Sequence, residues 1–221
     1  MTAPINRILF DLDGTLLDSA KDLHDCLNNV LTAHGKPCVD LSLVQQHLNV
    51  GARGLVQIGF QEPLEEKILD QLQQEFLSYY TRLTFTEPAH FFEDTLILLN
   101  TLFEKGIAWG IVTNKHERFT RPILENLGLL DKTQVLICGN MVSKGKPSPI
   151  PLYMACNHLK IAPDQTCYVG DSLVDMQAAQ RAGMPGLLVL WGYWKRLGYS
   201  IEGWPYQQKF ATPLELLHWI V

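Results

Sequence analysis

The chain has 221 residues, of which 47% are apolar and 19% are charged, and its formal net charge is −5. This length suits one large domain or a core with a smaller appended domain, and the composition is not that of a disordered chain. The acidic balance, without a dense Lys/Arg cluster, argues against nucleic-acid binding, and no apolar run approaches the roughly 20 residues of a membrane helix.

The cysteines and the first residues of the chain predict a cytoplasmic protein. The five cysteines are odd in number, scattered and without a CxxC pair, which is typical of reduced, buried thiols. An acidic strand end interrupts the N-terminal apolar run, so this segment lacks the layout of a signal peptide. The seven histidines show no spacing typical of zinc ligands. We expect a cytoplasmic monomer or homodimer.

Five short apolar runs predict the strands of a parallel sheet that is buried on both faces. Helical periodicity between the last four runs gives the strand–helix alternation of an α/β doubly wound domain. Such domains bind ligands at the carboxyl ends of their strands, and three of the runs end in polar residues there. The predicted strands of this mainly parallel, five-stranded, Rossmann-like sheet are Ile5–Phe10, Ala108–Val112, Val135–Cys138, Thr166–Val169 and Gly186–Leu190.

The segment of residues 19–85 breaks this alternation, because it is far longer than one crossover helix requires. One apolar helical face runs from Leu23 to Leu31, and a second stripe follows Pro63, which suits the first turn of a helix. We predict a core domain of residues 1–18 and 86–221, with residues 19–85 as a small helical cap domain that ends near Thr86-Glu87-Pro88. The second stripe comprises Leu64, Ile68, Leu72, Phe76 and Tyr80.

The run Asp11-Leu12-Asp13-Gly14-Thr15 follows the first predicted strand. Asp11 and Asp13 are two residues apart on an extended segment, so their carboxylates point roughly the same way and need a cation or a shared proton. Mg²⁺ suits such hard oxygen ligands and leaves room for water and phosphate oxygens. Gly14 permits an unusual backbone conformation and the close approach of a ligand. The alternative is a solvated strand end that caps a helix, and the complete DxDGT pattern favours the metal site.

A second acidic pair, Asp171 and Asp175, follows the fourth predicted strand. Residues four apart share one side of a helix start, so both carboxylates can complete an acidic pocket beside the first pair. The alternative is that Asp171 only caps the helix.

Polar residues at two further loops suit a phosphate. Thr113-Asn114-Lys115 offers a hydroxyl and loop N–H groups at a strand end, although polar residues are common in such loops. Lys146 precedes a proline and is positioned to neutralise phosphate charge. A solvated surface lysine is the alternative, and it fits Lys144 better than Lys146.

These motifs resemble, in order, the four motifs of the haloacid dehalogenase-like hydrolase superfamily, and the resemblance covers nearly the whole chain. The stretches DLDGTLLDS, WGIVTNK, KGKPSP and VGDSLVDMQAAQRAGM resemble the phosphoglycolate phosphatase-like branch. Thr113-Asn114-Lys115 and Trp191-Gly192-Tyr193 also resemble N-acetylmuramic acid 6-phosphate phosphatases, which belong to the same branch. The motifs specify the mechanism better than the substrate.

The resemblance implies a role for each motif residue. Asp11 resembles the nucleophile and Asp13 the general acid/base, while Thr113, Asn114 and Lys146 correspond to the phosphate-binding positions. The implied cofactor is Mg²⁺, held by Asp11, by the backbone carbonyl of Asp13 and by a further aspartate. That aspartate is Asp171, and the supporting residues are Asp175, Gly14 and Thr15.

The implied activity is hydrolysis of a small phosphorylated metabolite through an aspartyl-phosphate. 2-Phosphoglycolate is the first expectation, and N-acetylmuramic acid 6-phosphate or another sugar phosphate is the alternative. Asp13 argues against a dehalogenase, which needs no acid for its leaving group. A sugar-phosphate mutase stays open, as does a phospho-accepting or catalytically silent phosphate-binding protein, although the DxDGT spacing and the inserted cap disfavour a receiver domain.

Three features leave their function open. Arg53 lies between glycines, in what the sequence suggests is a turn of the cap, and is a candidate contact for the leaving group; an exposed surface arginine is the alternative. His116 follows the phosphate loop and fits a solvated helix start better than a ligand. The C-terminal aromatics Trp191, Tyr193, Trp194 and Trp204 fit core packing or a lid better than sugar stacking.

Overall fold

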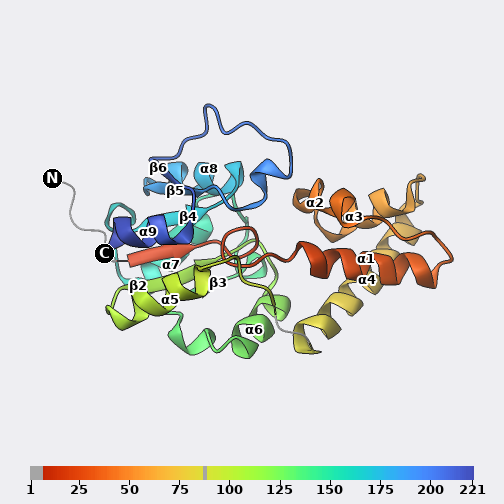
Figure 1. Cartoon of the computed structure of the whole chain (residues 1–221), viewed down its shortest axis with the longest axis horizontal. Helices are drawn as coiled ribbons and strands as arrows, with labels where there is room; N and C mark the ends of the chain where they lie inside the picture. Colours follow the sequence, from red (N-terminus) through yellow and green to blue (C-terminus); the bar gives the residue numbers. More distant parts are fainter. Residues whose placement is uncertain (1–6, 87–88) are drawn as a thin grey trace.

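The computed structural model describes residues 7–86 and 89–221. Six parallel strands form one sheet in the order β3-β2-β1-β4-β5-β6 (Figure 1). This confirms the α/β doubly wound fold, with six strands in place of the five predicted. The first two residues of the predicted first strand, Ile5 and Asn6, lie outside the described residues. The strands are β1 (Arg7–Phe10), β2 (Ala108–Val112), β3 (Leu136–Ile137), β4 (Cys167–Gly170), β5 (Gly186–Val189) and β6 (Gln208–Phe210).

The sixth strand escaped prediction because it does not have an apolar pattern. Gln208 and Lys209 are exposed at the edge of the sheet, and only Phe210 is buried. Polar, exposed residues are ordinary on an edge strand, which has a neighbour on one side only.

Helices cover both faces of the sheet, because successive residues of each buried strand point to opposite sides. Ile8 and Phe10 pack on the face that α5 and α9 cover, whereas Leu9 packs on the face of α7 and α8. The core helices are α5 (Thr95–Glu104), α6 (Glu117–Asn126), α7 (Ile150–Leu159), α8 (Leu173–Ala182) and α9 (Pro213–Ile220). Short 3₁₀ turns are η1 (Leu48–Val50), η2 (Leu130–Lys132), η3 (Gly139–Met141), η4 (Pro163–Gln165) and η5 (Tyr193–Lys195).

Four helices between β1 and α5 stand to one side of the sheet and pack on one another (Figure 1). They share a separate apolar cluster that includes Leu27, Leu55 and Phe76. The assignment of these helices to a separate cap domain stays a prediction. The exact domain boundaries stay a prediction, since α4 ends at Thr86, and Glu87 and Pro88 lie outside the described residues. The helices are α1 (Ala20–Ala33), α2 (Leu41–Gln45), α3 (Gly51–Phe60) and α4 (Glu66–Thr86).

Two local expectations about these helices were wrong. The predicted turn around Arg53 is the first turn of α3, where Gly51 has a positive φ of 69° and starts the helix. The apolar stripe of α4 runs through Leu69, because Ile68 is 43% exposed and Leu69 is buried. A one-residue rotation of the stripe is within what a helical period of 3.6 allows.

The four helices contact the core mainly through α6. Phe119 of α6 belongs to their apolar cluster and meets the ring of Tyr80 edge-on at 5.2 Å between centroids. Asn126, at the end of α6, donates to the carbonyl of Thr84 over 2.9 Å. No helix among the described residues is both long and apolar enough to span a membrane.

Candidate active site

A tight loop at the carboxyl end of β1 presents the first acidic pair. The N–H of Asp11 still donates to the carbonyl of Val169 in β4 over 2.9 Å, so the strand ladder fixes its position. The carbonyl of Leu12 then accepts from the backbone N–H groups of residues 15, 16 and 17, which turns the chain back. Gly14 has a φ of +85°, which a residue with a side chain rarely adopts. The result is a buried Asp11 with a more exposed Asp13 beside it.

Lys146 lies at the centre of the buried charges. Its Nζ is 2.8 Å from Oδ1 of Asp11 and donates to Oδ1 of Asp175 over 2.6 Å and to the Tyr168 hydroxyl over 2.7 Å. The Tyr168 hydroxyl donates in turn to the carbonyl of Val112, which fixes its direction. Burial acts to lower the pKa of Lys146, but the attraction of Asp11 and Asp175 outweighs it and raises that pKa. Lys146 is therefore a held cation facing Asp11.

Asn114 fixes the backbone at Lys146. Its side-chain amide donates to the Lys146 carbonyl over 3.0 Å, and its Oδ1 accepts from the Lys146 N–H over 2.8 Å. The Asn114 side chain is thus engaged by the protein, which leaves its backbone N–H for the predicted phosphate contact. A Cβ at Gly145 would lie 2.6 Å from Asn114 Oδ1, so the absence of a side chain allows this clamp. Thr113 is buried and lines the cavity described below.

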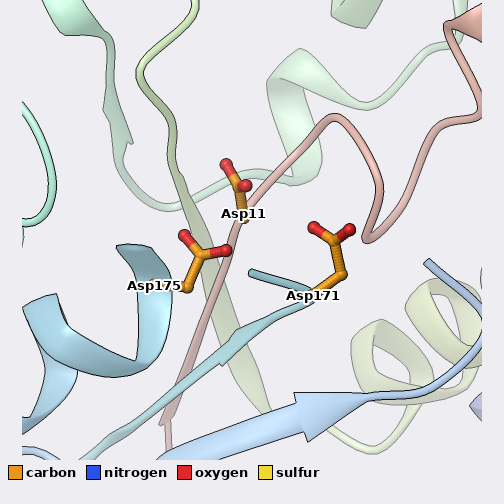
Figure 2. A group of neighbouring side chains, drawn as sticks. All are labelled: Asp11, Asp171 and Asp175. Carbon is orange, nitrogen blue, oxygen red and sulfur yellow. The ribbon is translucent and has the colours of Figure 1, made fainter. Parts of the chain in front are cut away.

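Three carboxylates meet at the carboxyl ends of β1 and β4 and the start of α8. Oxygens of Asp11, Asp171 and Asp175 lie within 4.8 Å of one another, and Figure 2 shows the three groups converging. Burial raises the pKa of Asp11 to about 7, and burial together with Asp175 and Asp11 raises that of Asp171 well above its ordinary value. The cluster has more negative charge than Lys146 offsets.

This donor set fits a divalent cation with oxygen ligands. Oδ1 of Asp11 takes no well-angled hydrogen bond from the described residues, although Lys146 is close. Asp175 is less free, because Lys146 occupies Oδ1 and the N–H and hydroxyl of Ser172 occupy Oδ2. Asp11 and Asp171 are therefore the carboxylates that would face Mg²⁺, with Asp175 behind them, and hard oxygen ligands of this kind suit Mg²⁺.

The loop after β5 closes the other side of Asp171. The N–H of Tyr193 donates to Asp171 Oδ2 over 2.7 Å, and a Cβ at Gly192 would lie 2.3 Å from Asp171 Cβ. A Cβ at Gly14 would lie 2.5 Å from Asp171 Oδ2. Two glycines thus allow two backbone segments to enclose this carboxylate. The sequence showed Tyr193 only as part of an aromatic segment.

The same loop reaches the first connection between the sheet and α1. The Ser19 N–H donates to the Tyr193 hydroxyl over 2.7 Å, and Arg196 pairs with Asp18 at 2.9 Å. Trp191 donates from Nε1 to the carbonyl of Thr15 over 2.9 Å, so the backbone of Thr15 is bound while its own hydroxyl has no partner among the described residues. Two of the four C-terminal aromatics, Trp191 and Tyr193, therefore hold the site's loops in place.

Sequence reasoning missed Lys115, which lies between Asp13 and the α4 helix. Its Nζ is 3.0 and 3.1 Å from the two oxygens of Asp13 and donates to the Tyr80 hydroxyl over 2.5 Å. The Tyr80 ring centroid is 4.6 Å from the same nitrogen. Its position in the sequence could have indicated this role. Lys115 lies two residues after Thr113, and on an extended segment residues two apart project their side chains in the same direction.

Arg53 is not brought to this site. It pairs with Glu66 and Asp70 on α4, and the cavity wall near it is formed by Gly51 and Ala52. His116 caps α6, where its Nδ1 accepts from the N–H of Arg118, and it also lines the cavity.

A cavity of about 410 Å³ lies between the sheet and the α1–α4 helices. Its floor carries the charged groups described above, among them Asp11, Asp13, Lys146 and Asp171. Its opposite wall is mostly apolar, and the side chains there include Leu23, Leu48, Phe76 and Leu77. An apolar wall with a few convergent polar groups is typical of a small-molecule site.

Comparison with known proteins identifies the family. Residues 8–189 match the sequence profile described as haloacid dehalogenase-like hydrolase. The chain belongs to the haloacid dehalogenase-like hydrolases. It is 40% identical over 191 residues to a phosphoglycolate phosphatase of Xanthomonas campestris pv. campestris. The aligned residues cover 86% of this chain and 85% of that relative. An N-acetylmuramic acid 6-phosphate phosphatase of Pseudomonas aeruginosa is 36% identical over 191 residues, covering 86% of this chain and 83% of that relative.

Solved structures of the family share the fold. A crystal structure described as a predicted phosphoglycolate phosphatase from Haemophilus somnus 129PT superposes with a TM-score of 0.88 and 25% identity, and the match covers 100% of both chains. The resemblance inferred from the four motifs is thus confirmed, and the chain is a phosphatase of the haloacid dehalogenase-like hydrolase family.

Proposed function

We propose that this hydrolase is a Mg²⁺-dependent phosphomonoesterase that forms an aspartyl-phosphate on Asp11, and that its substrate is 2-phosphoglycolate. The observation that supports the mechanism best is the position of Lys146, whose ammonium is 2.8 Å from the Asp11 carboxylate. A cation held there offsets the repulsion between an attacking carboxylate and a phosphate dianion. The choice of 2-phosphoglycolate as the substrate is supported by relatives named phosphoglycolate phosphatase.

In the first step, a carboxylate oxygen of Asp11 attacks phosphorus while the bond from phosphorus to the leaving oxygen breaks. Asp13 gives its proton to that oxygen, so glycolate departs with a hydroxyl group and not as an alkoxide. In the second step, Asp13 takes a proton from water, the water oxygen bonds to phosphorus, and the bond to Asp11 breaks. Asp11 is restored and phosphate is released.

Lys146, Thr113 and the backbone N–H of Asn114 would bind the phosphoryl oxygens. Mg²⁺, held by Asp11, Asp171 and the Asp13 carbonyl, would neutralise charge on those oxygens. The buried partners of Lys146 keep its position constant during both steps, which is how such sites avoid reorganisation.

One observation favours N-acetylmuramic acid 6-phosphate as a second candidate. The cavity of about 410 Å³ and its apolar wall exceed what the two-carbon glycolate unit fills. A relative at 36% identity is named for that substrate. The sugar would contact the wall formed by Leu23, Phe76 and Leu77.

The deciding experiment is phosphate release with and without Mg²⁺ over a panel of 2-phosphoglycolate, N-acetylmuramic acid 6-phosphate, other sugar phosphates and nucleotides. We expect Mg²⁺-dependent release, fastest from 2-phosphoglycolate, and none from the Asp11→Asn variant. Isomerisation of a phosphosugar without net release would instead indicate a mutase. Binding of phosphate esters with no turnover of any would indicate a silent binding protein.

A further inference from the structure

The cavity floor has two lysines, and their surroundings differ. Lys146 is enclosed by Asp11, Asp175 and Tyr168 at the phosphate end. The second lysine, Lys115, follows the end of β2 and contacts Tyr80 of α4. Both line the cavity, so a substrate held between the sheet and the helices meets one cation at each end.

Lys115 is oriented by a residue of α4. The Tyr80 hydroxyl accepts from Nζ over 2.5 Å, and the ring lies 4.6 Å from the same nitrogen. The Lys115 side chain is only 9% exposed. Its Nζ forms an ion pair with the Asp13 carboxylate at 3.0 Å, so the side chain is an ammonium ion. A cation with so little water needs an anion as a partner.

In the free protein that anion is Asp13, whose two oxygens are 3.0 and 3.1 Å from Nζ. Under the proposed mechanism, Asp13 must turn to the leaving oxygen of the substrate. Lys115 then keeps the Tyr80 contact and loses its anionic partner, at a point next to the leaving oxygen. A carboxylate on the leaving group would restore the pairing.

Among the described residues of α1–α4 that line the cavity, none is a cation. Arg53 lies on α3 but pairs with Glu66 and Asp70 of α4. The cap-side residues that line the described cavity include Leu23, Leu48, Phe76 and Leu77, all apolar.

We propose that Lys115, held by Tyr80, is the specificity-determining residue that binds a carboxylate of the substrate's leaving group. The inference rests on the proposed phosphatase function and deepens it, because it selects phosphate monoesters that carry a carboxylate. Both candidate substrates do: 2-phosphoglycolate has it next to the ester carbon, and N-acetylmuramic acid 6-phosphate has it on the lactyl ether.

The test compares two pairs of substrates. The first pair differs by a carboxylate in place of a methyl group, and the second differs by the whole lactyl ether that carries the carboxylate. The pairs are 2-phosphoglycolate against ethyl phosphate, and N-acetylmuramic acid 6-phosphate against N-acetylglucosamine 6-phosphate. The wild-type kcat/KM is expected to favour the carboxylate ester in one pair by at least about tenfold, the scale of a hydrogen bond to a charged group. The pair that responds identifies which carboxylate Lys115 receives.

Three variants assign that preference to Lys115. Lys115→Met, which keeps an unbranched side chain one atom shorter and removes the charge, is expected to reduce the preference by about 10- to 100-fold through KM. Lys115→Arg is expected to restore part of it, and Tyr80→Phe to reduce it by a smaller factor. Lys144→Met, the same change on an exposed lysine, is the matched control and is expected to leave the preference unchanged.

If Lys115→Met lowered kcat/KM by the same factor for both members of both pairs, the inference would be overturned. Lys115 would then act only by positioning Asp13. If Lys115→Met does not fold, wild-type ratios near one for both pairs overturn it equally. Calorimetric titration of Asp11→Asn with 2-phosphoglycolate and ethyl phosphate, with and without Lys115→Met, separates the two proposals. The same titration is made with N-acetylmuramic acid 6-phosphate and N-acetylglucosamine 6-phosphate. Absence of turnover by the wild type contradicts the phosphatase, whereas equal affinities within both pairs contradict the carboxylate contact.

Discussion

The ammonium of Lys146 donates to Oδ1 of Asp175 over 2.6 Å, in a place where the Asp175 side chain has no exposed surface. Asp175 lies on the first turn of α8, and its other oxygen accepts from the N–H and hydroxyl of Ser172. Ser172, at the start of α8, therefore fixes the Asp175 carboxylate, and that carboxylate fixes Lys146, which faces Asp11. Asp175 acts on the phosphate end of the site without facing the substrate.

Replacing Asp175 by asparagine keeps the shape and removes the charge. We expect kcat/KM to fall about 10- to 100-fold, as for other residues that orient a ligand. We also expect the free energy of unfolding to fall by about 1.5–3 kcal/mol, since a charged acceptor of buried hydrogen bonds is lost while Lys146 keeps Asp11 as a partner. Phosphate release and urea unfolding measure the two effects. Asp164→Asn, at an exposed position, is the control; equal behaviour of the two variants would contradict this role.

The pH dependence of stability tests the environment of Asp11. Burial raises its pKa from 3.8 to about 7, with Asp175 adding to the increase and Lys146 opposing it. The folded metal-free protein therefore binds this proton more tightly than the unfolded chain does. The resulting stability is complete below about pH 4 and is lost as the pH rises through about 7.

Asp11→Asn removes this titration, so the metal-free wild type should lose stability relative to the variant by up to about 4 kcal/mol between pH 4 and pH 8. Urea unfolding in the presence of a chelator measures it. Mg²⁺ should oppose the loss in the wild type, because the ion binds ionised carboxylates. A difference between the two proteins that stays constant over this pH range would show that Asp11 titrates normally.

Gly14 tests the close approach of the first loop to Asp171. Gly14→Ala would place a Cβ 2.5 Å from Asp171 Oδ2 and would also force alanine into a φ of +85°. Gly35→Ala is the matched control, since Gly35 has a φ of +65° and nothing within 4 Å of the added Cβ. Both should lose about 1–2 kcal/mol from backbone strain.

Only Gly14→Ala should also lose the response to Mg²⁺. Saturating Mg²⁺ at 100 times its Kd should stabilise the wild type by about 2.7 kcal/mol, or roughly 5–10 °C in Tm. The Gly35→Ala protein should show the same increase in a thermal unfolding scan, and the Gly14→Ala protein little or none. An undiminished Mg²⁺ shift in Gly14→Ala would place the metal elsewhere.

Tyr193 tests the contact between the C-terminal loop and the start of α1. Tyr193→Phe leaves the ring and the backbone bond to Asp171 but removes the acceptor of the buried Ser19 N–H. We expect a loss of about 1 kcal/mol and about fivefold faster hydrogen exchange at the Ser19 amide. Tyr153→Phe, which removes a hydroxyl bonded to the Arg181 carbonyl at the surface, should change neither. Unaltered exchange at Ser19 would mean that another group accepts this N–H.

The sequence was sufficient to predict five of the six strands and the residues of the acidic cluster. Buried parallel strands give near-continuous apolar runs, and parallel strands place all their carboxyl ends on one edge. Asp11, Thr113 and Asp171 each follow such a run, so their meeting follows from topology without knowledge of side-chain contacts. The end of α8 is equally local, because Gly183 has a φ of +69° there.

The tertiary structure decided which partner each polar side chain takes. Asp13 and Lys115 are 102 residues apart in sequence, and Lys115 and Tyr80 are 35 apart, so no periodicity could have paired them. Arg53 pairs with two carboxylates of α4, and the Asn114 amide faces the Lys146 backbone, where Gly145 leaves space for it. Local pattern determines which residues are buried and where strands end, whereas the direction of a polar side chain depends on charges that only folding brings near.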